Sequence, residues 1–146
     1  MAYDDHPAED DVTWWPAAHG ERQAIRVDSR STAGAYAVIE SVADADTAVP
    51  THLHHNEEEH FLVLSGHYRI AIGDQVIDAP AGARATVPRN TPHSWRNVAD
   101  GESRLLATIV PGGFEQLVYL VKDAPAEDVI ALAARFGCDI LGPPAV

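Results

Sequence analysis

The sequence predicts an all-β domain whose short antiparallel strands close into a barrel or pack as a sandwich, with one or two helices at the C-terminal end. Ten prolines and ten glycines are spread along the 146 residues and separate short runs rich in Val, Ile, Tyr and Leu, a pattern that favours strands joined by turns. No helical pattern interrupts these runs before residue 110, and two helical stripes follow it. The hydrophobic content of 46% suffices for one domain with its own core.

Residues 1–20 form an acidic N-terminal segment that ends near the tryptophan pair Trp14-Trp15. Its carboxylates gather near the start of the chain: Asp4, Asp5, Glu9, Asp10 and Asp11. We expect this stretch to be a solvated, poorly ordered tail. Because adjacent tryptophans are unfavourable in water, we expect the pair to pack on the domain or on a partner chain.

The expected barrel covers residues 21–112. Runs of strand-forming residues predict strands at 23–28, 35–42, 59–64, 68–72, 75–77, 84–87, 93–97 and 104–110, separated by Gly, Asp, Asn or Pro. A tight hairpin is predicted at Gly73-Asp74, because glycine adopts the positive φ that such turns need. Regular short strands without helices between them are typical of a closed sheet or a sandwich.

The segment 113–146 is expected to pack on the barrel as helices. The first apolar stripe comprises Phe114, Leu117, Val118 and Val121, and the second comprises Val129, Leu132, Ala133 and Phe136. Both stripes have the i, i+3, i+4, i+7 spacing of an amphipathic helix. The second helix follows Pro125, and Gly137 is a natural stop for it. We expect residues 141–144 to form a tail.

The formal net charge of -12 argues against binding to nucleic acid or to an anionic membrane surface, because both would repel the chain. No apolar run approaches the ~20 residues of a membrane span, and the first residues lack the basic and apolar regions of a secretory signal. A single cysteine, Cys138, fits a reducing compartment. We therefore expect a cytoplasmic protein that binds a small-molecule substrate.

Four residues in two separated stretches predict a metal site. Because side chains alternate along a strand, His52 and His54 share one face, and the returning chain can bring Glu59 beside them. His93 would join them from a distant strand. Three imidazoles and a carboxylate suit one divalent transition metal (Fe, Mn, Ni, Cu, Zn or Co) without choosing among these ions. Taken separately, a His-x-His pair or an acidic turn is more often a surface feature, so the prediction depends on the joint pattern.

The joint pattern resembles the two motifs of the cupin superfamily, over roughly residues 30–112. The first motif, G-x5-H-x-H-x3-4-E-x6-G, is matched from His52 through Glu59 to Gly66, with Asp46 in place of the opening glycine. The second motif, G-x5-P-x-G-x2-H-x3-N, is matched by Gly82, Pro88, His93 and Asn97, with Asn90 in place of the inner glycine. Asparagine tolerates a left-handed backbone, so this departure is mild.

The resemblance implies a jelly-roll antiparallel β-barrel with a metal inside it, held by His52, His54, Glu59 and His93. It also implies a homodimer, because small cupins often pair. A finer similarity, in Pro50-x-His-x-His-His and in the stretch 104–115, links the chain to quercetinase-like single-domain cupins.

Strand alternation sends further side chains toward the same interior. Phe61 and Trp95 would wall a mostly apolar pocket for a flat organic substrate. Tyr36 and Tyr68 are further candidates for its lining. The alternative is ordinary barrel core, because a small barrel needs large inward side chains to fill it.

From the resemblance we expect a dioxygenase-type oxidoreductase that acts on an enolisable or phenolic small molecule. Glu59 would either ligate the metal or act as a general base on a substrate hydroxyl. Two alternatives stay open. One is a metal-dependent cyclase, isomerase or lyase of polyketide or secondary metabolism, and the other is a barrel that binds a small molecule without turnover.

Overall fold

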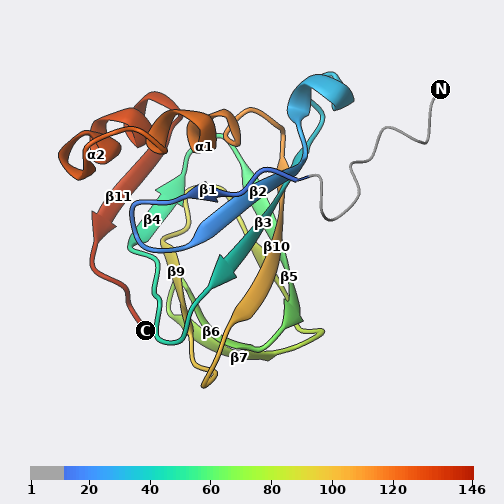
Figure 1. Ribbon diagram of the computed structural model, residues 1–146, viewed down its shortest axis with the longest axis vertical. Coiled ribbons are helices and arrows are strands. Elements are labelled where there is room, and N and C mark those ends of the chain that lie inside the picture. Colours follow the sequence, from blue (N-terminus) through green and yellow to red (C-terminus); the bar gives the residue numbers. More distant parts are fainter. Residues whose placement is uncertain (1–11) are drawn as a thin grey trace.

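The computed structural model describes residues 12–146 as two antiparallel β-sheets that face each other and enclose a barrel (Figure 1). The first sheet has the strand order β1 (Trp15–Pro16), β2 (Arg22–Val27), β3 (Ala37–Ala43), β10 (Ser103–Val110), β5 (Glu58–Ser65), β8 (Arg84–Val87). The second sheet has the order β11 (Cys138–Gly142), β4 (Thr51–His54), β9 (His93–Asn97), β6 (His67–Ile72), β7 (Gln75–Pro80). The predicted all-β fold is confirmed.

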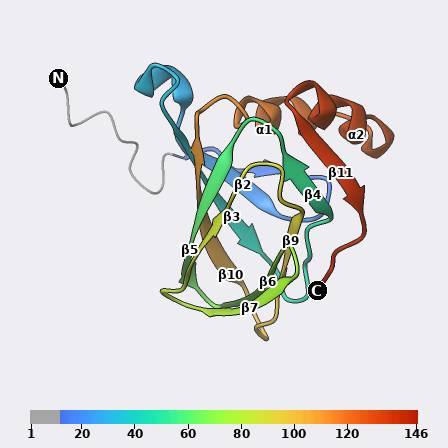
Figure 2. The same ribbon diagram turned by 180° about the vertical axis from the view of Figure 1, so that it is seen from behind.

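Two C-terminal helices, α1 (Gln116–Val121) and α2 (Ala126–Arg135), are also confirmed. They lie over the end of the barrel that is opposite to the β6–β7 hairpin, as both views show (Figures 1 and 2). A short 3-10 turn, η2 (Ser29–Thr32), links β2 to β3. In the described part of the chain, no helix has the length and apolar character that crossing a membrane requires.

The tail expected at 141–144 belongs to a strand in its first half, because β11 runs from Cys138 to Gly142. β11 pairs antiparallel with β4, where Cys138 lies opposite His54 and Ile140 opposite His52. This pairing shields the outer edge of the strand that carries two of the predicted metal ligands. The sequence signal was weak because the run is short, ends at a Gly-Pro-Pro stretch, and has its hydrogen-bonding partner more than 80 residues earlier in the chain.

The hydrophobic core fills the barrel unevenly. Its largest cluster lies between the two sheets and includes the fully buried side chains of Phe61, Val63, Tyr68, Ile70 and Leu105. Two smaller clusters lie beneath α1 and α2, and Phe114 contributes to both. The helices therefore cover their end of the barrel with apolar side chains while leaving room beneath them.

The tryptophan pair packs on the domain, as predicted. The Trp15 ring meets Tyr119 of α1 edge to face, with 5.7 Å between ring centroids. The ring of Trp14 lies against the guanidinium groups of Arg26 and Arg104. The acidic residues expected in a solvated tail, from Asp4 to Asp11, lie outside the described residues.

Backbone conformation explains how the two motifs tolerate their departures from glycine. Asp46 and Asn90, which stand where the motifs have glycine, have φ values of 66° and 61°. Both residues therefore keep the left-handed turn, which Asp and Asn adopt more readily than other non-glycine residues. Gly66 allows no such exchange, because it has φ 80° and a Cβ there would collide with Ser103.

Candidate metal centre

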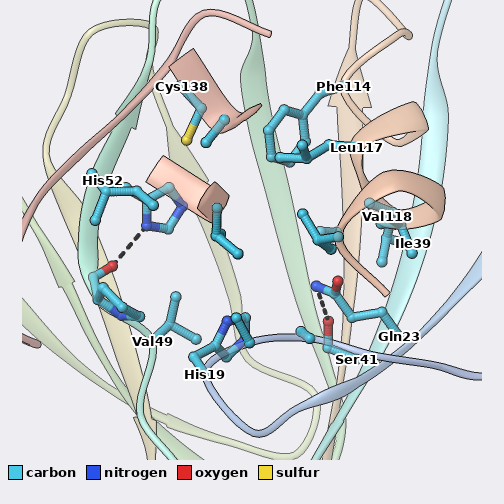
Figure 3. A pocket seen from close by; sticks show the side chains of 18 of the residues that line it. His19, Gln23, Ile39, Ser41, Val49, His52, Phe114, Leu117, Val118 and Cys138 are labelled. Carbon is cyan, nitrogen blue, oxygen red and sulfur yellow. Dashed lines mark hydrogen bonds between the residues drawn. The ribbon is translucent and has the colours of Figure 1, made fainter. Parts of the chain in front are cut away.

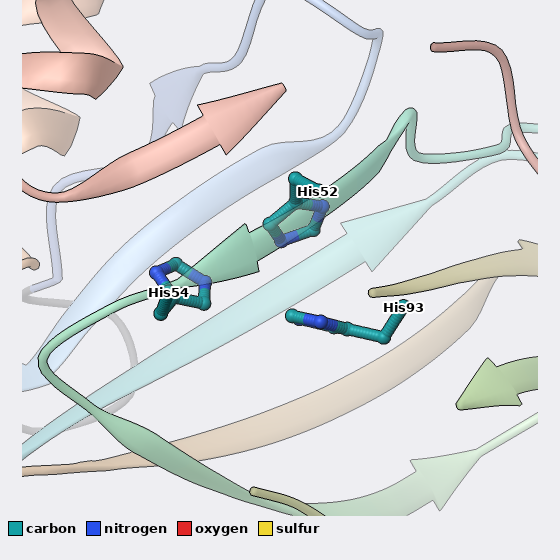
Figure 4. A group of neighbouring side chains, drawn as sticks. All are labelled: His52, His54 and His93. Atoms are coloured by element: carbon teal, nitrogen blue, oxygen red, sulfur yellow. The ribbon is translucent and has the colours of Figure 1, made fainter. Parts of the chain in front are cut away.

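The four predicted ligands come from both sheets and meet in the barrel. His52 and His54 lie on β4, and the register places His93 of β9 opposite His52. Glu59 enters from β5 in the other sheet. One nitrogen of each imidazole lies within 4.8 Å of the others, and the three rings approach a common centre (Figure 4). All four side chains are buried.

Backbone carbonyls fix the tautomer of two of the imidazoles. Nδ1 of His52 lies 2.8 Å from the carbonyl oxygen of Pro50, and Nδ1 of His93 lies 2.9 Å from that of Thr91. A carbonyl oxygen can only accept, so each Nδ1 carries the proton and donates it. The lone pair of the neutral ring is then on Nε2, the atom that is left to bind a metal.

Glu59 lies close to the imidazoles of His54 and His93. Its Oε1 is 2.8 Å from Nε2 of His54, although without the alignment of a hydrogen bond, and its Oε2 is 3.5 Å from Nε2 of His93. On the far side of His54, Oε2 of the buried Glu57 lies 3.7 Å from Nδ1. No hydrogen bond joins these two atoms, so Glu57 acts on the His54 ring through its charge.

Unpartnered polar atoms concentrate at this point. Among the described residues, six buried side-chain N or O atoms have no hydrogen-bond partner, and four of them belong to His54, Glu59 and His93. Such atoms are rare in folded proteins, because burying them without a partner is unfavourable. A cation bound at the centre would satisfy both Nε2 atoms and the carboxylate together, so the residues fit a metal. Their role as ligands stays a prediction.

The electrostatics favour the metal-binding protonation states of His52 and Glu59, whereas without a metal they favour the protonated form of His54. Burial, followed by the charges of His93 and His54, lowers the pKa of His52 to about 3. Burial alone would raise the pKa of Glu59, but His54 and His93 hold it below its ordinary value. Burial lowers the pKa of His54 and Glu59 raises it, with a raised pKa as the net result. A neutral His52 and an ionised Glu59 are both ready to donate an electron pair.

An apolar cavity of about 310 Å³ opens onto this cluster (Figure 3). His52, Glu59 and Trp95 line it on the side of the cluster, and apolar side chains of the first sheet and of both helices form its other walls. The Phe114 ring meets the His54 ring edge to face, with centroids 4.4 Å apart. The helices therefore shape the cavity, a role that their amphipathic stripes alone do not reveal.

The four predicted pocket residues divide between cavity, core and surface. Trp95 lines the cavity, with its ring 5.8 Å from that of His52. Phe61 lies behind Trp95 in the core, and Tyr68 is fully buried there, so neither borders the described cavity. Tyr36 is 40% exposed and lies apart from it. Phe61 and Tyr68 are therefore part of the ordinary barrel core.

The sequence carried no signal for a buried carboxylate that contacts two residues of the cavity wall. The Glu21 side chain is fully buried, with one oxygen near His19 and the other accepting a hydrogen bond from Trp95. Neither His19 nor Glu21 belongs to a recognisable motif, and their place is set by Trp95, which is 74 residues away in sequence. Asn97 of the second motif has a structural role, because its amide nitrogen donates to three backbone carbonyls.

Comparisons with known proteins agree with this architecture. Residues 38–109 match the family model of the cupin domain. Among solved structures, the polyketide cyclase RemF from Streptomyces resistomycificus is 20% identical, with 75% of this chain and 80% of that chain covered at a TM-score of 0.64. A predicted oxalate decarboxylase from Thermotoga maritima is 15% identical, with 71% and 96% covered at a TM-score of 0.68. KdgF from Halomonas sp. is 14% identical, with 75% and 96% covered at a TM-score of 0.67.

At these identities the solved structures establish a shared fold, and no curated protein matches the chain in sequence. The fold is the jelly-roll barrel that the two motifs implied. The matched domain, the shared barrel and the histidine cluster together support the cupin superfamily as the family of this chain.

Proposed function

We propose that this chain is a metal-dependent cupin dioxygenase that acts on an enolisable or phenolic small molecule. The observation that carries the proposal is the opening of a buried cluster of three histidines and one carboxylate into an apolar cavity of about 310 Å³. A cavity of this size with few polar groups is typical of a small-molecule site. A metal that only stabilises a fold is instead enclosed by its ligands.

The cluster would hold one divalent transition metal through His52, His54, His93 and Glu59. When bound, the ion supplies Lewis acidity toward a substrate oxygen and, if it is redox-active, electron exchange with O2. The chain supplies a preformed arrangement, because Pro50 and Thr91 hold two imidazoles in the tautomer that binds through Nε2.

Glu59 has a second task in this proposal. Among residues 12–146 it is the only carboxylate that lines the cavity, and its Oε1 lies 2.8 Å from Nε2 of His54. An ionised carboxylate in this position is the chain's acceptor for a proton from a substrate hydroxyl. Removing that proton leaves an electron-rich enolate or phenolate, and the apolar walls exclude water from it.

Oxygen consumption tests the proposal. The native protein, loaded separately with Fe, Mn, Ni, Cu, Co and Zn, is incubated with a flavonol and with a β-diketone. We expect oxygen uptake and substrate loss with at least one redox-active metal and none with Zn. Glu59→Gln should lower the rate by about 100-fold or more, whereas His60→Gln, on the exposed face of the same strand, should not. Absence of oxygen uptake with every metal would refute dioxygenase chemistry.

A metal-dependent cyclase, isomerase or lyase is the second candidate. It is supported by the apolar cavity, which suits a folded polyketide-like molecule, and by the fold shared with the polyketide cyclase RemF. Product formation without oxygen, with Zn sufficient, would favour it over the dioxygenase. A small molecule that co-purifies with the protein and is recovered unchanged would favour binding without turnover.

A further inference from the structure

The cavity has a second group of polar side chains, separate from the metal cluster. His19, Gln23 and Ser41 line it together with the apolar residues, and they lie away from Phe114 and Cys138 in the close view (Figure 3). Gln23 donates a hydrogen bond of 3.4 Å to Ser41, so these two side chains partly satisfy each other. His19 has no hydrogen bond to either of them in the described part of the chain.

A buried carboxylate holds the His19 ring. Nε2 of His19 lies 2.6 Å from Oε1 of Glu21, whose side chain is fully buried. The other oxygen of Glu21 accepts a 3.0 Å hydrogen bond from Nε1 of Trp95. Because a buried carboxylate is unfavourable unless both oxygens have partners, this arrangement fixes all three side chains in one geometry.

The backbone also restricts His19. The turn from Ala17 to Glu21 is closed by two backbone hydrogen bonds, from Ala17 to the Glu21 carbonyl and from Gly20 to the Ala17 carbonyl. Trp95, which donates the hydrogen bond to Glu21, also stacks on His93, with ring centroids 6.2 Å apart. His19 therefore has a defined position relative to the metal cluster, although it belongs to no cupin motif.

The hydrogen-bonding character of His19 follows from its partner. A carboxylate oxygen accepts, so Nε2 of His19 carries a proton, and in the neutral ring Nδ1 is an acceptor. Nδ1 has no partner among residues 12–146, and the side chain is about one-fifth exposed while lining the cavity. An unpartnered acceptor recognises a hydrogen-bond donor, and a hydroxyl group is the donor that a phenolic or enolic substrate carries.

We infer that His19, held by Glu21, is a positioning residue that accepts a hydrogen bond from a second hydroxyl group of the substrate. The substrate class is then a largely apolar molecule with hydroxyl groups at two separated positions, one at the metal and one at His19. This inference rests on the proposed function, because it takes the metal cluster as the place where the first oxygen binds.

Binding of two probes to the Zn-loaded protein without oxygen tests the inference. The probes are quercetin, which has hydroxyl groups on both ring systems, and the unsubstituted flavonol, whose single hydroxyl lies beside the carbonyl. In titration calorimetry at alkaline pH, His19→Phe should bind quercetin about tenfold more weakly, which corresponds to one lost hydrogen bond. Its affinity for the unsubstituted flavonol should change by no more than about twofold. His60→Phe, on the exposed face of β5, is the matched control.

Glu21→Gln reverses the polarity of the same contact. The amide oxygen can still accept from Trp95, while the amide nitrogen donates to Nε2 of His19 and so moves the ring proton to Nδ1. The cavity would then present a donor, which binds hydroxyl and methoxy oxygens alike. The native protein should prefer quercetin to a quercetin that is methylated at the hydroxyl contacting His19. In Glu21→Gln this preference should fall about tenfold. This variant keeps the size of the side chain and both contacts, so it tests the inference if His19→Phe folds poorly.

Three results would overturn the inference: equal weakening of both probes by His19→Phe, an unchanged preference in Glu21→Gln, or a native protein that does not bind quercetin more tightly than the unsubstituted flavonol. Metal content separates these results from failure of the proposed function. Native protein and His19→Phe should both bind one Zn per chain, and loss of Zn from the native protein would refute the metal centre instead.

Discussion

The two ends of the barrel are built from the same strands but are filled in different ways. On β5, the inward side chains run from Glu59 at the metal cluster to Phe61 and Val63 in the core. On β9, they run from His93 through Trp95 to Asn97. Two residues along β5, and four along β9, therefore lead from unpartnered polar atoms of the cluster to closely packed or hydrogen-bonded side chains. One end of the barrel supplies stability, and the end beneath the helices supplies the site.

A cavity-forming mutation in the packed end should give the largest effect. Ile70 is 1% exposed in the main core cluster and lies outside the cavity. We expect Ile70→Ala to lower the free energy of unfolding by about 2–5 kcal/mol, because the lost contacts and the new void add together. Urea denaturation measures the loss. Metal content per folded molecule should stay at the native value, and a parallel loss of metal would show that the two ends are not independent.

Mutation of a proposed metal ligand should instead lower metal affinity more than it lowers the free energy of unfolding. We expect His54→Ala to weaken metal affinity by about 100-fold or more, since losing a ligand should exceed the effect of losing an outer partner. His55→Ala is the matched control, because the His55 ring is exposed and contacts Asn90 and Asp139 instead of the cluster. Competition with a chelator of known affinity measures both. Equal losses in the two variants would contradict the assignment of strand faces.

Acid should destabilise the metal-free protein, because the fold keeps the buried His52 in its neutral form. Its pKa of about 3 in the folded chain lies below its ordinary value of 6.5, so only the unfolded chain takes up a proton as the pH falls between these values. The neutral imidazole thus contributes stability above about pH 6.5 that is lost toward pH 3. His52→Gln removes this loss, and relative to the native protein it should gain about 2–3 kcal/mol between about pH 7 and pH 4.

The chelator-treated proteins are compared by urea denaturation at each pH. His54 has a raised pKa and acts in the opposite direction, so the difference between the two proteins is the informative quantity. A constant difference across this pH range would show that His52 is not buried in its neutral form.

The smallest effect is expected from the carboxylate behind His54. Oε2 of Glu57 lies 3.7 Å from Nδ1 of His54 and is buried. We expect Glu57→Gln to lower metal affinity by about tenfold, because the ring loses its orienting charge while all proposed ligands remain. Glu58→Gln, whose side chain is 38% exposed and contacts His60, should leave affinity unchanged. The same chelator competition applies, and a loss as large as that of His54→Ala would make Glu57 a ligand.

Local patterns were sufficient to predict the packed end and the cluster of three histidines. Alternation along two strands and the spacing of both motifs placed His52, His54, Glu59 and His93 on inward faces, where the structure has them. The backbone requirements at Asp46 and Asn90 were equally local, because a left-handed turn needs only a residue that tolerates it.

The cavity end could not be predicted in the same way, because its walls come together only in three dimensions. β11 completes the sheet beside β4 from the other end of the chain. Glu21 is buried because Trp95 and His19 satisfy its two oxygens, and nothing in its own neighbourhood of the sequence indicates burial. The helix stripes predicted packing but not the space left beneath them.

The most direct test of the central claim is anomalous diffraction from crystals of the protein loaded with one transition metal and measured at that metal's absorption edge. We expect one peak per chain, about 2.0–2.2 Å from an imidazole nitrogen of His52, His54 and His93 and from a Glu59 oxygen. No peak at this centre, or a metal bound elsewhere on the chain, would contradict the proposed metal site.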